Sequence, residues 1–168
     1  MRPAIHALAI VAGLAAPIAL TFWSTSGSGP RSAAQAAAIA AEAMTPRQVV
    51  EAFEALAFDQ RKPLEAARKY ISPEMRDHSQ RIVGDYPSII AFLEKLDWAK
   101  EGGGPQRTIH HLVAEGDIVM VHHHLVRTPG TPGISAVDIF RVKDGKIVEH
   151  WEALQDLPAT SPNKFGAF

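Results

Sequence analysis

The order of its segments predicts that this chain folds as an α+β domain, with three helices packed on one face of a mainly antiparallel sheet. Apolar residues recur at helical spacing in three stretches of the first half, and four later stretches are extended and rich in β-branched residues. A glycine-rich segment at residues 101–105 separates the two halves. Helices followed by a run of strands are typical of α+β folds.

We expect helices over residues 45–58, 62–71 and 86–100. Thr45 is suited to cap the first helix, and Pro46 fits its first position because the missing N–H group has no helical partner there. Between the second and third helices, residues 73–85 are polar and predict an irregular segment with a short strand at 81–83.

We expect strands over residues 106–115, 118–128, 134–143 and 146–154. Asp144 and Gly145 predict a tight two-residue type I′ hairpin between the last two strands. Such a turn places Asp138 opposite Trp151 and points His150 away from the helices. A bulged turn would exchange the roles of Trp151 and His150.

The composition limits the class of function. The 168 residues suffice for one domain, which we place at residues 45–157, with a C-terminal tail at 158–168. The net charge of −1 gives no indication of a nucleic-acid partner. The chain has no cysteine, which excludes disulfides, thiolate metal sites and a cysteine nucleophile.

Residues 1–40 have the composition of a secretory signal. One arginine precedes a nearly continuous apolar run at 4–23, and small residues suited to signal-peptidase cleavage follow. We expect export to the periplasm or the outside of the cell after cleavage, with no membrane contact. An uncleaved anchor at 4–23 is the alternative, because about 20 apolar residues can span a bilayer. A cytoplasmic protein is the third possibility.

Three consecutive histidines, His122, His123 and His124, lie within an apolar, β-branched run. Side chains alternate between the two faces of a strand, so His122 and His124 share one face and His123 points to the other. We expect the pair to face the helices, and His123 to lie at the surface or at a subunit interface. Half-buried, hydrogen-bonded core histidines are the alternative for the pair.

Asp138 lies in an apolar strand and shares a predicted face with Phe140. A buried carboxylate is unfavourable unless it is paired, hydrogen-bonded or protonated. Desolvation would raise its pKa toward the range of a general base that works near neutral pH. We therefore expect Asp138 to be a catalytic base, with an ion pair that only stabilises the fold as the alternative.

Further side chains are expected to line a pocket beside this carboxylate. Phe140 and Trp151 would shape its wall, although Trp151 could also be a plain core residue. His78 follows the second helix, and loops over a sheet often carry binding residues. His110 and His111 alternate in their strand, so only one of them can face the core. We favour His110 over His111, through a bulged turn at Glu115-Gly116-Asp117.

A His-x-His pair near a carboxylate could also hold a metal ion, because imidazole is the commonest protein ligand for zinc, copper and iron. Such a site would resemble that of a cupin, which needs a glutamate a few residues after the pair. The sequence has Leu125-Val126-Arg127-Thr128 there. We therefore expect no metal and no cofactor.

Two stretches, HHLVAEGDIVMVHHHL at 110–125 and AVDIFRVKDGKIVEHWEALQ at 136–155, resemble the SnoaL-like branch of the superfamily named after nuclear transport factor two. Tyr70, His78 and the helix YPSIIAFLEKL fit the same pattern. The resemblance covers residues 45–157. It implies a cone-shaped barrel, in which a strongly curved, mainly antiparallel sheet wraps three helices around an internal pocket.

The resemblance also implies a chemistry. The best-studied members of the family are polyketide cyclases that close a ring by aldol condensation without metal or cofactor, and their acid/base aspartate matches Asp138. Polar positions on the preceding strand match His122 and His124, which would stabilise the enolate oxygen. The cyclases have a further histidine where this sequence has Ala136. Tyr70 is expected, with His78, to contact the substrate.

We therefore predict a cofactor-free acid/base enzyme for aldol condensation or cyclisation, isomerisation or dehydration of a small, mostly apolar, carbonyl-bearing compound. A non-catalytic module that binds a small ligand in the same pocket is the alternative, because one fold can host both functions. We also expect a homodimer through the outer face of the sheet, where Val137 and Ile139 would be left uncovered by the helices.

Overall fold

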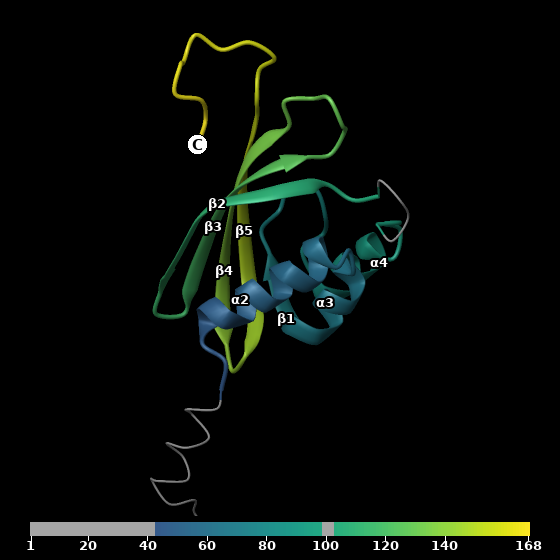
Figure 1. Ribbon diagram of the computed structural model, residues 1–168. Coiled ribbons are helices and arrows are strands. Elements are labelled where there is room, and N and C mark those ends of the chain that lie inside the picture. The colour runs from purple at the N-terminus through teal and green to yellow at the C-terminus, as the bar shows by residue number, and fades with distance from the viewer. Residues whose placement is uncertain (1–42, 99–102) are drawn as a thin grey trace, which may run out of the picture.

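The computed structural model describes residues 43–98 and 103–168 (Figure 1). In this part of the chain, a five-stranded sheet of order β1-β5-β4-β3-β2 carries the helices on one side. β1 is parallel to β5, and the other neighbours are antiparallel. The expected α+β fold is thereby confirmed. The expected signal or membrane anchor at residues 1–40 lies outside the described residues, and within residues 43–98 and 103–168 no helix is long and apolar enough to cross a membrane.

The helical elements are α2 (Pro46–Glu54), the π-helical turn η1 (Ala55–Asp59), α3 (Pro63–Tyr70) and α4 (Tyr86–Leu93). Helix α2 begins as predicted: the Thr45 hydroxyl accepts a hydrogen bond from Gln48 N–H, and Gln48 Oε1 accepts one from Thr45 N–H. Helix α4 is shorter than expected, because the chain leaves it through tighter i→i−3 turns that begin at Lys95.

The segment between α3 and α4 contains a strand that the sequence did not predict. β1 (Ile71–Asp77) pairs in parallel with the last strand at one edge of the sheet. Pro73 and the charged residues around it are not typical of a strand. A strand at an edge, however, needs hydrogen bonds on one side only and so tolerates proline. The short strand expected at 81–83 is wrong, since these residues form a turn and a bend followed by irregular chain.

The four predicted strands are present as β2 (Gln106–Glu115), β3 (Ile118–Val126), β4 (Ile134–Lys143) and β5 (Lys146–Asp156). Asp144 and Gly145 have φ values of 51° and 73°, and the residues on either side of them pair directly. Positive φ at both central residues is the signature of the predicted type I′ turn.

A β-bulge in β5 changes the register that this turn sets. Val148 is an extra residue without a partner on β4. Beyond the bulge, Asp138 lies opposite Glu152 rather than opposite Trp151 as predicted. His150 therefore points toward the helices and Trp151 points away from them, so the prediction for these two residues is wrong. The turn itself is tight, and the extra residue lies in the strand after it.

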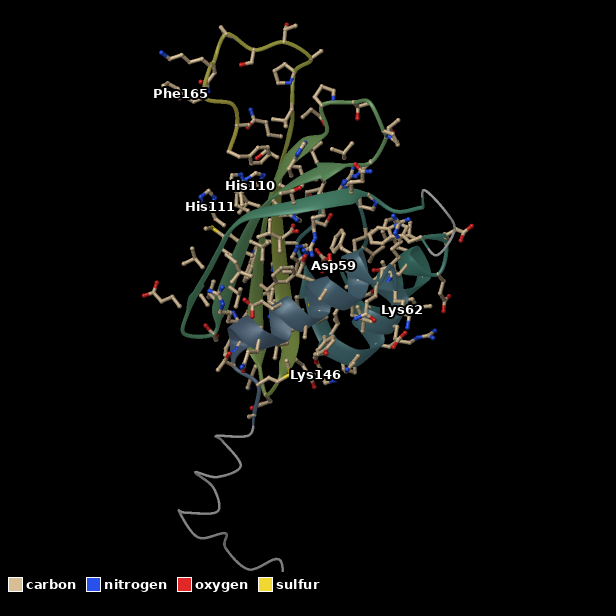
Figure 2. The ribbon with its side chains drawn as sticks, viewed as in Figure 1. Asp59, Lys62, His110, His111, Lys146 and Phe165 are labelled. Atoms are coloured by element: carbon tan, nitrogen blue, oxygen red, sulfur yellow. The ribbon has the colours of Figure 1, made fainter. Side chains whose placement is uncertain are left out.

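A second bulge lies in β2, where His110 is an extra residue between Ile109 and His111. Both His110 and His111 lie on the side of the sheet away from the helices (Figure 2), where the ring of His111 contacts that of His122. The prediction that His110 faces the core is wrong, because the bulge interrupts the alternation on which it depended.

β3 turns its odd-numbered residues toward the helices. Val119, Val121 and His123 are each 0% exposed, whereas His122 and His124 lie on the outer, half-buried face. The prediction that this pair faces the helices is therefore wrong. Both faces of β3 carry apolar residues, and burying the two valines in the core fixes the histidine between the pair on the inner face.

The outer face of the sheet carries Val137 and Ile139, which are only half-buried in the single chain. Both lie on the same face as His122, which pairs with Val137 between β3 and β4. This agrees with their expected direction away from the helices. A homodimer through this face stays a prediction.

Gly84 closes the loop that follows Asp77. Its φ is 95°, and Asp77 N–H donates a 2.8 Å hydrogen bond to Gly84 O. A Cβ atom added at Gly84 would lie 2.4 Å from Asp77 O, which is closer than real Cβ contacts allow.

We predict that Gly84→Ala lowers the free energy of unfolding by about 2–3 kcal/mol, because the Cβ atom clashes with backbone and the positive φ is strained. Gly130→Ala is the matched control: its φ is 82°, but no described atom lies within 4 Å of the added Cβ, so it should cost about 1 kcal/mol. Urea denaturation measures both. Equal losses in the two variants would contradict the importance of the Asp77 contact.

Candidate functional site

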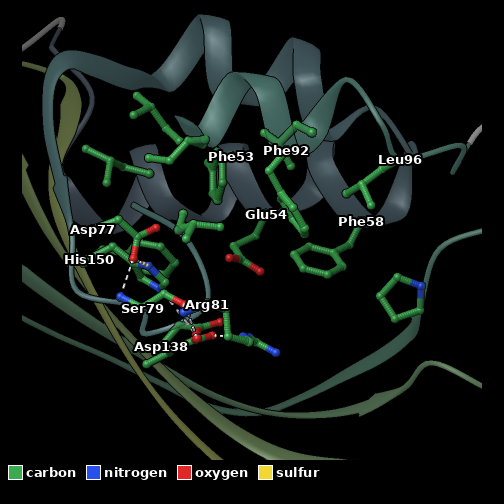
Figure 3. A pocket seen from close by; sticks show the side chains of 18 of the residues that line it. Phe53, Glu54, Phe58, Asp77, Ser79, Arg81, Phe92, Leu96, Asp138 and His150 are labelled. Carbon is green, nitrogen blue, oxygen red and sulfur yellow. Dashed lines mark hydrogen bonds and ion pairs between the residues drawn. The ribbon is translucent and has the colours of Figure 1, made fainter. Parts of the chain in front are cut away.

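A cavity of about 640 Å³ lies between the helices and the inner face of the sheet (Figure 3). Most of its wall is apolar, including Phe53, Phe58, Ile89, Phe92, Leu93 and Phe140. A cavity of this size suits a small to medium organic molecule. Phe140 thus lies on the wall where the sequence predicted a pocket residue.

Two carboxylates hold one imidazole on the sheet side of the cavity. His150 Nδ1 lies 3.1 Å from Asp77 Oδ1, and His150 Nε2 lies 3.3 Å from Asp138 Oδ1 (Figure 3). All three side chains line the cavity. They come from the adjacent strands β1, β5 and β4, and the bulge in β5 is what turns His150 inward. The unpredicted strand β1 therefore supplies Asp77, and the unpredicted bulge brings His150 into the site.

A second imidazole approaches Asp138 from β3. His123 Nε2 lies 2.9 Å from Asp138 Oδ2, which is an ion-pair distance. The ring is not turned for a hydrogen bond, and neither ring nitrogen has a hydrogen-bond partner among the described residues. The side chain is fully buried, with its ring edge-on to Phe58 at 6.4 Å between centroids. His123 therefore supports Asp138 from behind the wall.

The two histidines set the charge of Asp138. Burial alone would raise the pKa of Asp138, as expected from the sequence, but His123 and His150 outweigh burial and hold this pKa well below its ordinary value. Burial would likewise lower the pKa of His150, yet Asp138 and Asp77 raise it to about 10. At neutral pH the site holds an imidazolium between two carboxylates. The prediction of a raised Asp138 pKa is wrong, because it left out the imidazoles.

A third carboxylate, Glu54, enters the cavity from the helix side. Glu54 is 2% exposed and forms an ion pair with Arg107, whose guanidinium also lies 3.3 Å from Asp59 Oδ1. The same guanidinium lies over the ring of Phe58, 4.5 Å from its centroid. Burial raises the pKa of Glu54 to about 7, although Arg107 opposes the shift. The cavity therefore contains a carboxyl group that binds a proton near neutral pH.

The sequence carried a usable signal for Glu54 and none for Asp77. Glu54 follows Val50 by four residues, which places a charged side chain on the apolar face of its own helix. Asp77 lies in a polar segment whose strand was not predicted. His123 was assigned to the wrong face, and His150 was turned outward by an unbulged register.

A polar network ties the loop after β1 to the cavity wall. Glu152 accepts a 2.6 Å hydrogen bond from Ser79 Oγ and pairs with Arg81 Nη2 at 2.7 Å. Ser79 N–H donates to Asp77 Oδ1 at 2.8 Å. The loop therefore helps to orient Asp77 toward His150.

The other predicted site residues do not meet Asp138. His78 stacks on Trp151 with 5.0 Å between ring centroids, and its Nε2 lies 3.0 Å from Glu149 Oε1. Tyr70 is buried among core residues. The outer face of the sheet carries His110, His122 and His124. Of the predicted residues, the structure brings only Asp138 and Phe140 to the cavity wall.

Within the described residues, no group of three or more histidine, aspartate or glutamate side chains is arranged to hold a metal ion. The outer histidines have other partners: His122 Nε2 lies 3.0 Å from Ser135 Oγ, and His124 Nε2 lies 2.7 Å from Pro132 O. That the protein uses no metal and no cofactor stays a prediction.

A family model described as a SnoaL-like domain matches residues 49–150, more than half of the chain. The chain belongs to the SnoaL-like domain family. The resemblance predicted from the sequence is thereby confirmed, and the match includes Glu54, Asp77, His123, Asp138 and His150. A comparison of the SnoaL-like chain with curated proteins gives no match.

Solved structures share the fold of the SnoaL-like chain at low sequence identity. An NTF2-like protein of unknown function from Burkholderia xenovorans LB400 is 16% identical, with a TM-score of 0.54 over 70% of this chain and 87% of that one. Another from Cytophaga hutchinsonii is 16% identical, with a TM-score of 0.51 over 67% and 91%. A putative isomerase of the SnoaL-like family from Agrobacterium tumefaciens is 14% identical, with a TM-score of 0.51 over 67% and 99%. These similarities show the fold alone.

We predict that the SnoaL-like domain loses stability as the pH rises from 6.5 toward 10. The folded-state pKa of His150 is about 10, against an ordinary value of 6.5, so the folded state holds an extra proton in this interval. Its contribution is complete below 6.5 and is lost as the pH passes through the folded-state value. The free energy of unfolding in urea, measured across this pH range, should therefore fall.

Two variants test the assignment to His150. Asp77→Asn removes one of the two carboxylates that raise its pKa, so the loss of stability should move to lower pH. His122→Gln is the control, because His122 lies on the outer face and its pKa is lowered, first by desolvation and then by the neighbouring histidines. The same pH profile in Asp77→Asn and in the unaltered protein would rule His150 out as the source.

Proposed function

We propose that this SnoaL-like protein is a cofactor-free acid/base enzyme that acts on a small to medium, mostly apolar compound with a carbonyl group. Aldol condensation or cyclisation, isomerisation and dehydration are the candidate reactions, and they share the removal of a proton from the carbon beside a carbonyl. The observation that supports the proposal is Asp138, held by His150 at the wall of a mostly apolar cavity.

In this mechanism Asp138 is the base. An ionised carboxylate offers about four lone-pair positions, and His123 and His150 approach one oxygen each, so lone pairs are left for the substrate. The C–H bond breaks, its proton moves to Asp138, and its electron pair forms the enolate. His150 keeps its own proton between Asp77 and Asp138 and holds the base in place. Asp138 then returns the proton to carbon, or to the oxygen that leaves in a dehydration.

The low pKa of Asp138 narrows the choice of substrate. Each unit by which the base is weakened adds about 1.4 kcal/mol to the proton transfer. A plain ketone is therefore a poor substrate. The site suits a carbon whose proton is acidified by a second group, such as another carbonyl or an aromatic ring. It also needs a hydrogen-bond donor that stabilises the enolate oxygen in the cavity.

A non-catalytic module that binds a small ligand is the second candidate. The observation in its favour is that both oxygens of Asp138 already face an imidazole, as in an ion-pair network that only stabilises the fold. A module of this kind would bind its ligand through the apolar wall and would tolerate Asn at position 138.

The composition of residues 1–40 supports the further proposal that the domain acts after export, with an anchored form as the alternative. The half-buried apolar residues on the outer face support a homodimer that leaves the cavity free, since the cavity lies on the opposite face.

We predict that the protein accelerates deuterium uptake at the benzylic α-carbon of 2-tetralone in D₂O, followed by ¹H NMR. In this probe the exchanging carbon lies between a carbonyl group and an aromatic ring. Asp138→Asn removes the base and should lower the rate by about 10²-fold or more. Asp156→Asn, at the exposed end of β5, is the matched control and should leave the rate unchanged. Binding of 2-tetralone without exchange, equal in the unaltered protein and in Asp138→Asn, would instead support the ligand-binding module.

A further inference from the structure

The proposed reaction needs a donor for the enolate oxygen, and most polar groups of the cavity are already engaged. Both nitrogens of His150 face carboxylates. Ser79 and Arg81 are bound to Glu152. His123 is fully buried behind Asp138. On the opposite wall, Glu54 is a buried polar group that lines the cavity, and Arg107 pairs with one of its two carboxyl oxygens.

Glu54 lies where its helix changes geometry. It is the last residue of α2, and the π-helical turn begins at the next residue. Such turns are rare and often occur at functional sites. In Figure 3 the carboxyl group of Glu54 points from the helix toward the wall that carries Asp138. Phe58, at the other end of the π-turn, also lines the cavity and lies beneath the guanidinium that pairs with Glu54.

We propose that Glu54 is a second catalytic residue, a protonated carboxylic acid that donates a hydrogen bond to the substrate carbonyl oxygen while Asp138 removes the neighbouring proton. The proposal rests on the acid/base function proposed above and assigns a residue to its missing role. A molecule between the two walls meets an acid on the helix side and a base on the sheet side.

The charges around the two carboxyl groups support these opposite roles. Burial raises the pKa of Glu54 to about 7, while the imidazoles beside Asp138 overcome its burial and lower its pKa. Surroundings that push the pKa values of two carboxyl groups apart are typical of an acid and a base in one site. The carboxyl group with the higher pKa is the one that can donate.

Arg107 gives the proposed acid a stable ionised form. When Glu54 passes its proton to the carbonyl oxygen, an O–H bond forms on the enol and Glu54 becomes a carboxylate beside Arg107. Burial leaves Glu54 protonated at the start, although Arg107 opposes this. Ketonisation reverses both transfers, so each carboxyl group regains its starting state.

The exchange of 2-tetralone, followed against pH, tests the proposal. In the unaltered protein the rate should fall as the pH rises through about 7, because Glu54 then loses its proton. Glu54→Gln should lower the rate by about 10-fold and Glu54→Ala by about 10²-fold, and the fall near neutral pH should vanish in both. Glu51→Gln is the matched control, since Glu51 lies one turn earlier and pairs with Arg47 at the surface. A Glu54→Gln variant with unaltered rate and pH profile would overturn the role of Glu54, while loss of exchange in Asp138→Asn would still support the base.

A second measurement does not depend on turnover. ¹³C NMR of protein labelled at the glutamate δ-carbon follows the ionisation of Glu54, identified by its loss in Glu54→Gln. Saturating 2-naphthol, whose oxygen mimics the enol of 2-tetralone, should raise the pKa of Glu54 by accepting its hydrogen bond. A Glu54 signal that does not respond, or a cavity that 2-naphthol does not enter at millimolar concentration, would overturn the proposal even if no exchange is seen.

Discussion

The ion-pair network around Asp138 is the constraint on which the rest of this sheet depends. Burying a lone carboxylate on the inner face would cost several kcal/mol, so it must be matched by imidazoles placed next to it. His123 comes from β3 and His150 from β5, and Asp77 from β1 completes the set. Four neighbouring strands must therefore keep their register for one charge to be stable. The charge of Asp138 and the register of the sheet therefore depend on each other.

The helix side of the cavity is arranged around a different charge. Arg107 reaches from β2 to the two ends of the π-turn segment, where it pairs with Glu54, the last residue of α2, and with Asp59. An arginine thus pairs with the carboxyl group on the helix side of the cavity, and histidines pair with the carboxylate on the sheet side. Apolar residues line most of the space between the two walls, and a low local dielectric strengthens both sets of interactions. The two walls therefore favour opposite protonation states in carboxyl groups that share one cavity.

Much of the architecture could be predicted because it rests on local signals. Thr45 and Pro46 mark the start of the first helix, and Asp144 and Gly145 mark the last hairpin, each through the backbone geometry that these residues prefer. The apolar strand around Asp138 was enough to identify a buried carboxylate. These signals act over a few residues and do not depend on how the sheet closes.

The details of the site depend on strand register, bulges and distant contacts that no local sequence pattern indicates. Alternation fixes which histidines share a face, but a shift of one residue exchanges the faces, and apolar residues on both sides of β3 gave no preference. The buried valines decide the matter in favour of His123. Bulges at His110 and Val148 turn their neighbours in the opposite sense from an unbroken strand. The pKa of Asp138 moves down rather than up because of partners that are distant in sequence.

The bulge in β5 makes the cavity wall tolerant of a change in chain length. Val148 has no partner on β4, so replacing its side chain leaves the register of the strand intact. Removing Val148 would leave the register intact as well, because Glu149 would then follow Ile147 and still pair with Arg141, with His150 opposite Phe140 on the inner face. The wall would change if the strand kept Val148 and lost the bulge, since each later residue would then turn to the other face. Related chains that lack one residue at this point would therefore present the same wall, whereas chains of equal length without the bulge would not.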